Sequence, residues 1–194
     1  MKTAGIILAA GESKRMGRAK AFLPFRGGTF LSTLAETFGA FCSPVIAVFG
    51  FDGDAAALRA PAGVTPVVNR GYRRGMLTSL QAGLRSLDLN PAGRVLFTLV
   101  DHPAISRQTI ASLLETEAAI AIPRTGGQRG HPVLITSAVA EEYLLEPETA
   151  KVRDVIDRHA GRILYVDVDD PGIRDDVDDP AVYQALLARE AARL

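Results

Sequence analysis

The chain has 194 residues, of which 47% are hydrophobic and 23% charged, the composition of an ordinary globular protein. Its 22 Lys and Arg residues balance its 22 Asp and Glu residues, which argues against a protein that coats nucleic acid or an anionic membrane. A single cysteine, Cys42, excludes a disulfide within one chain and fits a cytoplasmic location. No apolar run is long enough to cross a bilayer, and we predict one domain over residues 1–194.

Short apolar runs alternate with helical patterns along the chain. The runs are rich in Val and Ile, which predicts strands that are covered on both faces, as in a parallel sheet. Ser106 and the pair Asp179-Pro180 are typical helix starts. The alternation predicts an α/β fold with three layers and a doubly wound, mostly parallel sheet. The predicted strands are 4–9, 45–49, 65–68, 95–100, 119–123, 132–136 and 163–168, and predicted helices begin near residues 30, 76, 106 and 180.

A loop rich in glycine and cations follows the first predicted strand. In open parallel sheets ligands bind beyond the carboxyl ends of the strands, and Gly11 lies directly after this one. Glycine lets backbone N–H groups approach an anion, while Arg15 offers a forked pair of donors and Lys20 a compact charge. Neither the Walker A spacing nor the dinucleotide fingerprint is present. The residues alone therefore leave two interpretations open, a polyphosphate site and a solvated turn with surface cations.

The wider pattern L-A-A-G-x-S-x-R-M-G-x-x-K, at residues 8–20, resembles the signature of nucleotidyltransferases with a glycosyltransferase-A-like fold. The resemblance implies that the loop embraces the base and triphosphate of an NTP. The family lines its base and ribose pocket with a segment similar to residues 69–84 of this chain. The nucleotide-binding residues that the resemblance implies are Leu8, Ala9, Ala10, Gly11, Ser13, Arg15, Lys20, Asn69, Gly75 and Ser79.

The segment 69–84 also carries a helical pattern. Gly75 precedes that pattern, so free N–H groups at the helix start can face a ligand. The spacing of Met76, Leu80 and Leu84 predicts that all three pack in the core.

Two acidic segments are candidates for a metal site. Asp101 ends the strand predicted at 95–100, where it fits either a Mg²⁺ ligand or a turn before a proline. The resemblance favours the metal, with His102 as a neighbour rather than a ligand. The segment 175–180 resembles the second metal-binding region of the family, although it also fits an ordinary acidic turn. Asp176 and Asp178 both match that region, and the choice between them stays open, with a preference for Asp178.

The segment R-G-H-P-V-L, at residues 129–134, resembles the molybdenum cofactor cytidylyltransferase branch of the family. On that resemblance we assign Arg129 and His131 to the acceptor pocket, although a solvated arginine and a turn histidine are the ordinary alternatives. The segment 146–156 departs from the pattern of that branch, because only Ala150 and Arg153 of its motif are present. Nucleotide transfer is therefore supported by more residues than the identity of the acceptor.

The resemblance implies a Mg²⁺-dependent enzyme that transfers CMP from CTP to a molybdopterin-type acceptor and releases pyrophosphate. Arg15, Lys20 and Asp101 are the expected catalytic residues, and a client molybdenum enzyme is a further expected partner. The alternatives are a guanylyltransferase that uses GTP, a sugar-phosphate nucleotidyltransferase of the same fold, and a non-catalytic nucleotide-binding chaperone for the cofactor. We expect neither a nucleic acid nor a membrane as a partner.

Overall fold

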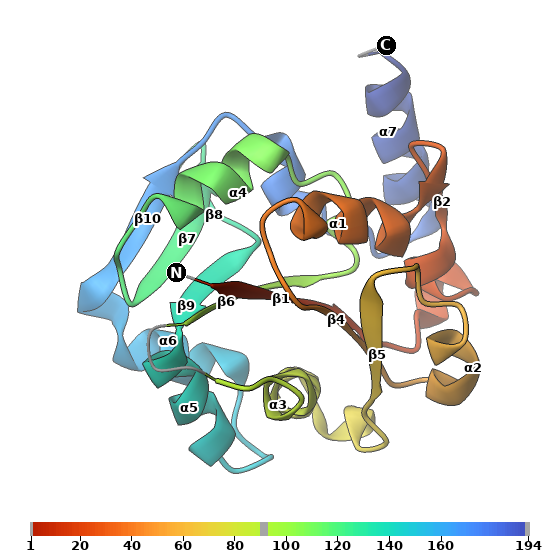
Figure 1. Cartoon of the computed structure of the whole chain (residues 1–194). Helices are drawn as coiled ribbons and strands as arrows, with labels where there is room; N and C mark the ends of the chain where they lie inside the picture. The colour runs from red at the N-terminus through yellow and green to blue at the C-terminus, as the bar shows by residue number, and fades with distance from the viewer. Residues whose placement is uncertain (1, 90–92, 193–194) are drawn as a thin grey trace.

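The computed structural model describes residues 2–89 and 93–192. Its centre is a sheet with the strand order β10-β7-β9-β6-β1-β4-β5, to which β8 adds by pairing with β7 (Figure 1). The strands along this order pair in parallel except β9, which is antiparallel to both of its neighbours. The strands are β1 (Thr3–Ala9), β4 (Val45–Phe49), β5 (Val64–Val68), β6 (Arg94–Leu99), β7 (Ile120–Thr125), β8 (Gln128–Arg129), β9 (Val133–Thr136) and β10 (Ile163–Asp167), with a separate hairpin of β2 (Pro24–Phe25) and β3 (Gly28–Thr29).

Helices cover both faces of the sheet (Figure 1). The helices α1 and α4 lie on one face, and α7 extends from the same side towards the C-terminus, whereas α3, α5 and α6 lie on the other face. The three-layer, mostly parallel α/β fold that the sequence predicts is therefore confirmed. The helices are α1 (Phe30–Gly39), α2 (Gly53–Ala57), α3 (Met76–Arg85), α4 (Arg107–Leu114), α5 (Ser137–Leu145), α6 (Val152–Arg158) and α7 (Pro180–Ala191).

The apolar residues form one core cluster on each face of the sheet. Phe30, Leu34 and Phe38 of α1 are fully buried in the first cluster. Leu80 and Leu84 of α3 are fully buried in the second. Burying such a side chain contributes about 1.5–3 kcal/mol, so these two clusters dominate the free energy of folding.

The orientation of β9 follows from the short connection that leads into it. The chain leaves β7 through a tight turn at Gly126 and Gly127, whose φ angles are 55° and 75°, a region that favours glycine. A parallel neighbour requires a crossover of a dozen or more residues, and the segment 126–132 is shorter than that. The strand β9 therefore returns antiparallel to β7 and fills the place between β7 and β6.

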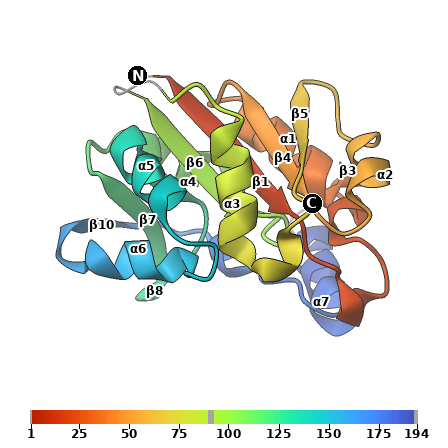
Figure 2. The same cartoon turned by 90° about the horizontal axis from the view of Figure 1, so that it is seen from below.

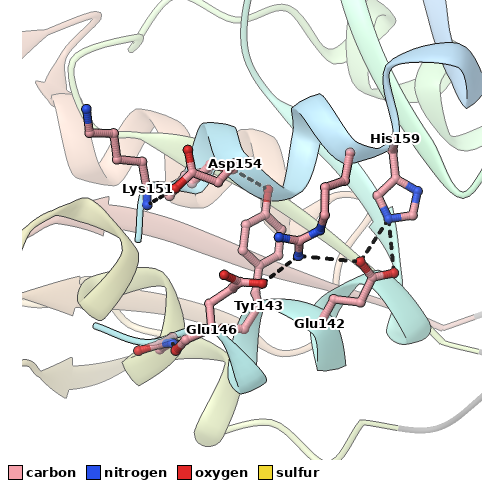
Figure 3. Close-up of polar contacts among 9 residues, drawn as sticks. Glu142, Tyr143, Glu146, Lys151, Asp154 and His159 are labelled. Carbon is pink, nitrogen blue, oxygen red and sulfur yellow. Dashed lines mark hydrogen bonds and ion pairs between the residues drawn. The ribbon is translucent and has the colours of Figure 1, made fainter. Parts of the chain in front are cut away.

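A polar network joins α5 to α6, the two helices that cover the same face of the sheet as α3 (Figure 3). The Tyr143 hydroxyl donates to the carbonyl of Val152 at 3.1 Å, and the Glu142 carboxylate lies 2.9 Å from Nε2 of His159. Arg158 bonds Glu146 at 2.5 Å. These contacts fix the connection between the two helices, which includes most of the segment 146–156.

Within the described part of the chain, none of the helices has the length and apolar character that crossing a membrane requires.

Candidate active site

A cavity of about 740 Å³ opens at the carboxyl ends of β1, β4 and β6. Figure 2 shows β1 running from the N-terminus towards the end of the sheet at which α7 lies. The position agrees with the rule that open α/β sheets bind ligands beyond the carboxyl ends of their strands. Of the residues predicted to bind nucleotide, those that line the cavity are Leu8, Ala9, Ala10, Gly11, Ser13, Arg15, Lys20, Gly75 and Ser79.

The loop after β1 lines this cavity, and its conformation is fixed by left-handed backbone angles and a hydrogen bond within the loop. Ser13 and Gly17 both adopt left-handed backbone angles, with φ of 51° and 67°. The Ser13 hydroxyl accepts a hydrogen bond from the backbone N–H of Lys20 at 3.2 Å, and the side chain of Met16 is buried beneath the loop. A Cβ added at Gly11 would meet no atom within 4 Å, so this position leaves open space beside the cavity. The loop therefore offers exposed backbone to a ligand.

Two cations of the loop meet carboxylates from distant parts of the chain. Nζ of Lys20 lies 3.0 Å from Oδ2 of Asp101 and 2.5 Å from Oδ1 of Asp178. The guanidinium of Arg15 bonds the other oxygen of Asp178. Burial by itself lowers the pKa of Lys20, but the charges of Asp101 and Asp178 outweigh it and raise the pKa overall. The hydrogen bond from Lys20 lowers the pKa of Asp178, so both groups are ionised at neutral pH.

Asp101, Asp176 and Asp178 form one carboxylate cluster. Each offers a ligand oxygen, and the three oxygens lie within 4.8 Å of one another. The backbone N–H of Val177 donates to the carbonyl of Asp101 at 3.1 Å, which fixes the segment 175–178 against the end of β6. Within the part of the chain that the structure describes, Oδ1 of Asp101 is buried and accepts no hydrogen bond. Three hard oxygen donors and an unsatisfied buried oxygen fit a divalent cation such as Mg²⁺ or Mn²⁺.

The segment 69–84 meets the cavity through the start of α3. Gly75 has a φ of 127° and leads directly into the helix, and Met76 is 47% exposed and lines the cavity. The prediction that Met76 packs in the core with Leu80 and Leu84 is therefore wrong for Met76. It occupies the first position of α3, which lies at the rim of the core rather than beneath it.

Asn69 lies behind the cavity wall rather than on it. Its side-chain amide donates to the hydroxyls of Thr78 and Ser79 at 2.9 and 3.0 Å, and its carbonyl oxygen accepts from the N–H of Gly71 at 2.9 Å. The side chain is buried. Asn69 thus connects the turn 69–75 to α3 through these hydrogen bonds. A direct contact between Asn69 and nucleotide stays a prediction.

Arg129 and His131 lie in different surroundings. Arg129 is exposed on β8 beside a second cavity of about 520 Å³, which it lines with Arg124 and Tyr165. The ring of His131 packs on the ring of His102, with centroids 4.6 Å apart, behind Asp101. Burial lowers the pKa of His131 to about 3, so this imidazole is neutral at physiological pH. Neither residue lines the 740 Å³ cavity, and their role towards an acceptor stays a prediction.

Glu12 was not predicted from the sequence, and it joins the loop after β1 to the turn before α3. Its carboxylate accepts from the Tyr72 hydroxyl at 3.1 Å and from Nε of Arg73 at 2.9 Å, and it pairs with Lys14 at 2.9 Å. The hydrogen bonds from Lys14, Arg73 and Tyr72 lower the pKa of Glu12 to about 2. Glu12 occupies a position that the motif leaves unspecified, so no sequence signal pointed to it.

Part of the cavity lining is apolar, and Phe49 ends β4 on the other side of β1 from Asp101, which follows β6. Phe22 and Phe49 stack with ring centroids 6.4 Å apart, and the guanidinium of Arg59 lies 3.6 Å from the ring centroid of Phe22. Phe51 and Met76 add further exposed apolar surface. The cavity lining therefore combines charged groups, which suit phosphates and a metal ion, with apolar side chains, which suit a flat ring.

Comparison with known proteins matches a family model to most of the chain. The model of the MobA-like NTP transferase domain matches residues 5–163. The chain is 29% identical over 179 residues to the molybdenum cofactor cytidylyltransferase of Escherichia coli K12, which covers 90% of each chain. It is 34% identical over 150 residues to the nicotine blue oxidoreductase of Paenarthrobacter nicotinovorans, covering 70% of this chain and 71% of that one. A probable molybdenum cofactor guanylyltransferase of Mycobacterium tuberculosis H37Rv is 32% identical over 137 residues, covering 63% and 62%.

Solved structures share the fold over nearly the whole chain. The crystal structure of Rv0371c from Mycobacterium tuberculosis H37Rv superposes with a TM-score of 0.78 at 28% identity, covering 97% of this chain and 98% of that one. A second structure of that protein, in complex with manganese, has a TM-score of 0.74 at 26% identity and covers 97% and 99%. The carboxylate cluster of this chain has the donor set that a manganese ion prefers.

Proposed function

We propose a nucleotidyl-transfer reaction for this chain, because it belongs to the MobA-like NTP transferase family. The whole chain acts as one NTP transferase domain in this proposal. A phosphate oxygen of the acceptor attacks the α-phosphorus of an NTP, the bond from that phosphorus to the bridging oxygen breaks, and pyrophosphate leaves. Family membership alone does not fix this reaction, since one relative carries the name of an oxidoreductase. The observation that carries it is the contact of Lys20 and Arg15 with Asp101 and Asp178, two members of the carboxylate cluster that also line the cavity.

The charged groups of the cavity address the main obstacle, which is repulsion between two anionic reactants. Lys20 and Arg15 neutralise the triphosphate, and the open backbone at Gly11 donates to its oxygens. A phosphate nucleophile needs no strong base, so positioning and charge stabilisation account for most of the rate. The base and ribose lie beside the apolar side chains of Phe49 and Met76.

Asp101 and Asp178 are the ligands that we assign to a divalent cation, with Asp176 as the third carboxylate of the cluster. Partial burial raises the pKa of Asp176, and the charges of Asp101 and Asp178 raise it further, so the cluster gains from a cation. A bound Mg²⁺ or Mn²⁺ supplies charge stabilisation at the phosphate that is transferred. Asp101, Asp178 and Lys20 would then share the task of orienting the phosphates.

We propose CTP as the nucleotide and a molybdopterin-type cofactor as the acceptor, which is then delivered to a client molybdenum enzyme in the cytoplasm. The similarity to the cytidylyltransferase over 90% of both chains supports CTP, while the relative that is named a guanylyltransferase makes GTP the second candidate. Arg129 on β8 is the cation that we assign to the anionic acceptor, because the β7–β8 turn lies at the carboxyl ends of the parallel strands, as the cavity does.

The experiment that tests the proposal measures pyrophosphate release with Mg²⁺ and molybdenum-loaded molybdopterin, with CTP, GTP, ATP and UTP supplied in parallel. We expect release with CTP. Release with GTP alone would keep the reaction and replace the nucleotide. No release with any nucleotide, from folded protein that binds NTP tightly, would favour the non-catalytic chaperone instead.

A further inference from the structure

Three cations of the loop after β1, Lys14, Arg15 and Lys20, are already paired with carboxylates of the chain itself. Lys14 pairs with Glu12, whereas Lys20 lies on Asp101 and Asp178. Arg15 also bonds Asp178. The carboxylates that we assign to a metal ion are thus the partners of the cations that we assign to the phosphates.

The side chain of Lys20 is only 12% exposed, so its ammonium is confined between the two carboxylates. It bonds one oxygen of Asp101 and one of Asp178, which removes charge and lone pairs that a divalent cation would need. A divalent cation that used the unbonded Oδ1 of Asp101 would still lie within a few ångströms of Nζ, and like charges at that distance in a half-buried site repel strongly. Lys20 and a metal ion therefore compete for one pair of carboxylates.

We propose that Lys20 is the resident counter-ion of the carboxylate cluster and leaves Asp101 and Asp178 for the nucleotide phosphates when nucleotide and metal bind. This inference rests on the proposed function and adds an order of events to it. The exchange leaves each charged group with a partner of opposite charge, because the phosphates replace the carboxylates around Lys20 while a divalent cation replaces Lys20 at the carboxylates. The cluster consequently binds a free divalent cation weakly until phosphates draw the ammonium away.

The test measures the affinity of Mn²⁺ alone, without nucleotide, by electron paramagnetic resonance of the free ion. We expect Lys20→Gln to bind Mn²⁺ at least about tenfold more tightly than the wild-type protein, since a neighbouring charge shifts an ionic equilibrium by one to three logarithmic units. The matched control is Lys14→Gln, which removes the same charge from the same loop but has its ion pair with Glu12. Its affinity should stay within about twofold of wild type, because exposed charges at a distance are screened.

Three further variants accompany Lys20→Gln, and Arg15→Gln keeps the proposal testable if Lys20→Gln folds poorly. Lys20→Arg keeps the positive charge and should not tighten Mn²⁺ binding. Arg15→Gln removes the second cation on Asp178 from a side chain that is 68% exposed, and it should tighten binding in the same direction by a smaller factor. Adding Asp178→Asn to Lys20→Gln should abolish the gain, which locates the ion at the cluster.

The outcomes separate this inference from the proposed function. Equal Mn²⁺ affinity in wild type, Lys20→Gln and Arg15→Gln would overturn the role of Lys20 as counter-ion, even if the wild-type protein releases pyrophosphate. An equal gain in Lys14→Gln would overturn it as well, because the effect would then reflect net charge. Tighter Mn²⁺ binding in Lys20→Gln, together with a wild-type protein that transfers no nucleotide, would support the counter-ion and refute the function.

Discussion

Gly50 offers a test of whether the shape of the cavity that we assign to nucleotide depends on the close approach of three segments. It follows β4, and a Cβ added there would lie 2.5 Å from the carbonyl oxygen of Ala10 and 2.5 Å from Cβ of Tyr72. Neither atom is the end of a flexible side chain, so the backbone of the loop after β1 or the turn at Tyr72 must move. Gly50→Ala should therefore deform the cavity, because Ala10 and Tyr72 both line it.

Overpacking of this kind costs about 1–3 kcal/mol. For a chain of this length, about 1 kcal/mol shifts the melting temperature by roughly 2–4 °C, so the expected fall is about 2–12 °C. The matched control is Gly39→Ala at the end of α1, where an added Cβ meets no atom within 4 Å. That change should raise the melting temperature slightly, because alanine favours a helix over glycine by about 0.5–1 kcal/mol.

Thermal unfolding and nucleotide titration calorimetry of the two variants give the comparison. We expect Gly50→Ala to lose both stability and affinity for nucleotide, while Gly39→Ala keeps its affinity. If Gly50→Ala melted and bound nucleotide like Gly39→Ala, the close packing of Ala10, Gly50 and Tyr72 would not shape the site.

Asp101→Asn should lower turnover by at least about 10²-fold while the protein stays folded, and retained pyrophosphate release would remove Asp101 from the metal site. The pKa of Glu12 is lowered from 4.5 to about 2, so the stability that it contributes is present above pH 4.5 and is lost as the pH falls towards 2. Glu12→Gln should flatten the decline of the unfolding free energy in that window, and parallel curves for the two proteins would contradict this. Asp179→Ala removes the cap that accepts from the N–H groups of Ala181 and Val182, so urea unfolding should show a loss of about 1 kcal/mol, and an unchanged midpoint would refute the cap.

The strands and layers could be predicted because their signals are local. The run 45–49 is apolar throughout and the run 95–100 is apolar except for Thr98, and short runs of this kind favour a strand that is covered on both faces. The helix start at Ser106 was equally readable, since its side chain accepts from the N–H of Thr109. The direction of β9 was not predicted, because it depends on a tight turn at Gly126 rather than on the residues of the strand itself.

The candidate site likewise has features that the sequence predicts and contacts that it does not. The pattern at residues 8–20 and the acidic segments could be recognised separately, and each was assigned to nucleotide or metal. The resemblance implies that they belong to one active site, but the direct contact of Lys20 with Asp101 and Asp178 was not predicted, since these residues lie 81 and 158 positions away from Lys20 in the chain. Whether Lys20 contacts the carboxylates that we assign to a metal ion is decided by tertiary packing, and no sequence pattern expresses it.

The transfer of the α-phosphate itself tests the central claim most directly. The measurement uses CTP labelled at the α-phosphorus, with Mg²⁺ and molybdenum-loaded molybdopterin, and follows both the label and pyrophosphate. The account predicts that the label moves to the acceptor with one pyrophosphate released for each transfer. Label that stays in CTP while the folded protein binds the nucleotide, or that appears only in free CMP, would contradict the assignment of this cavity to nucleotidyl transfer.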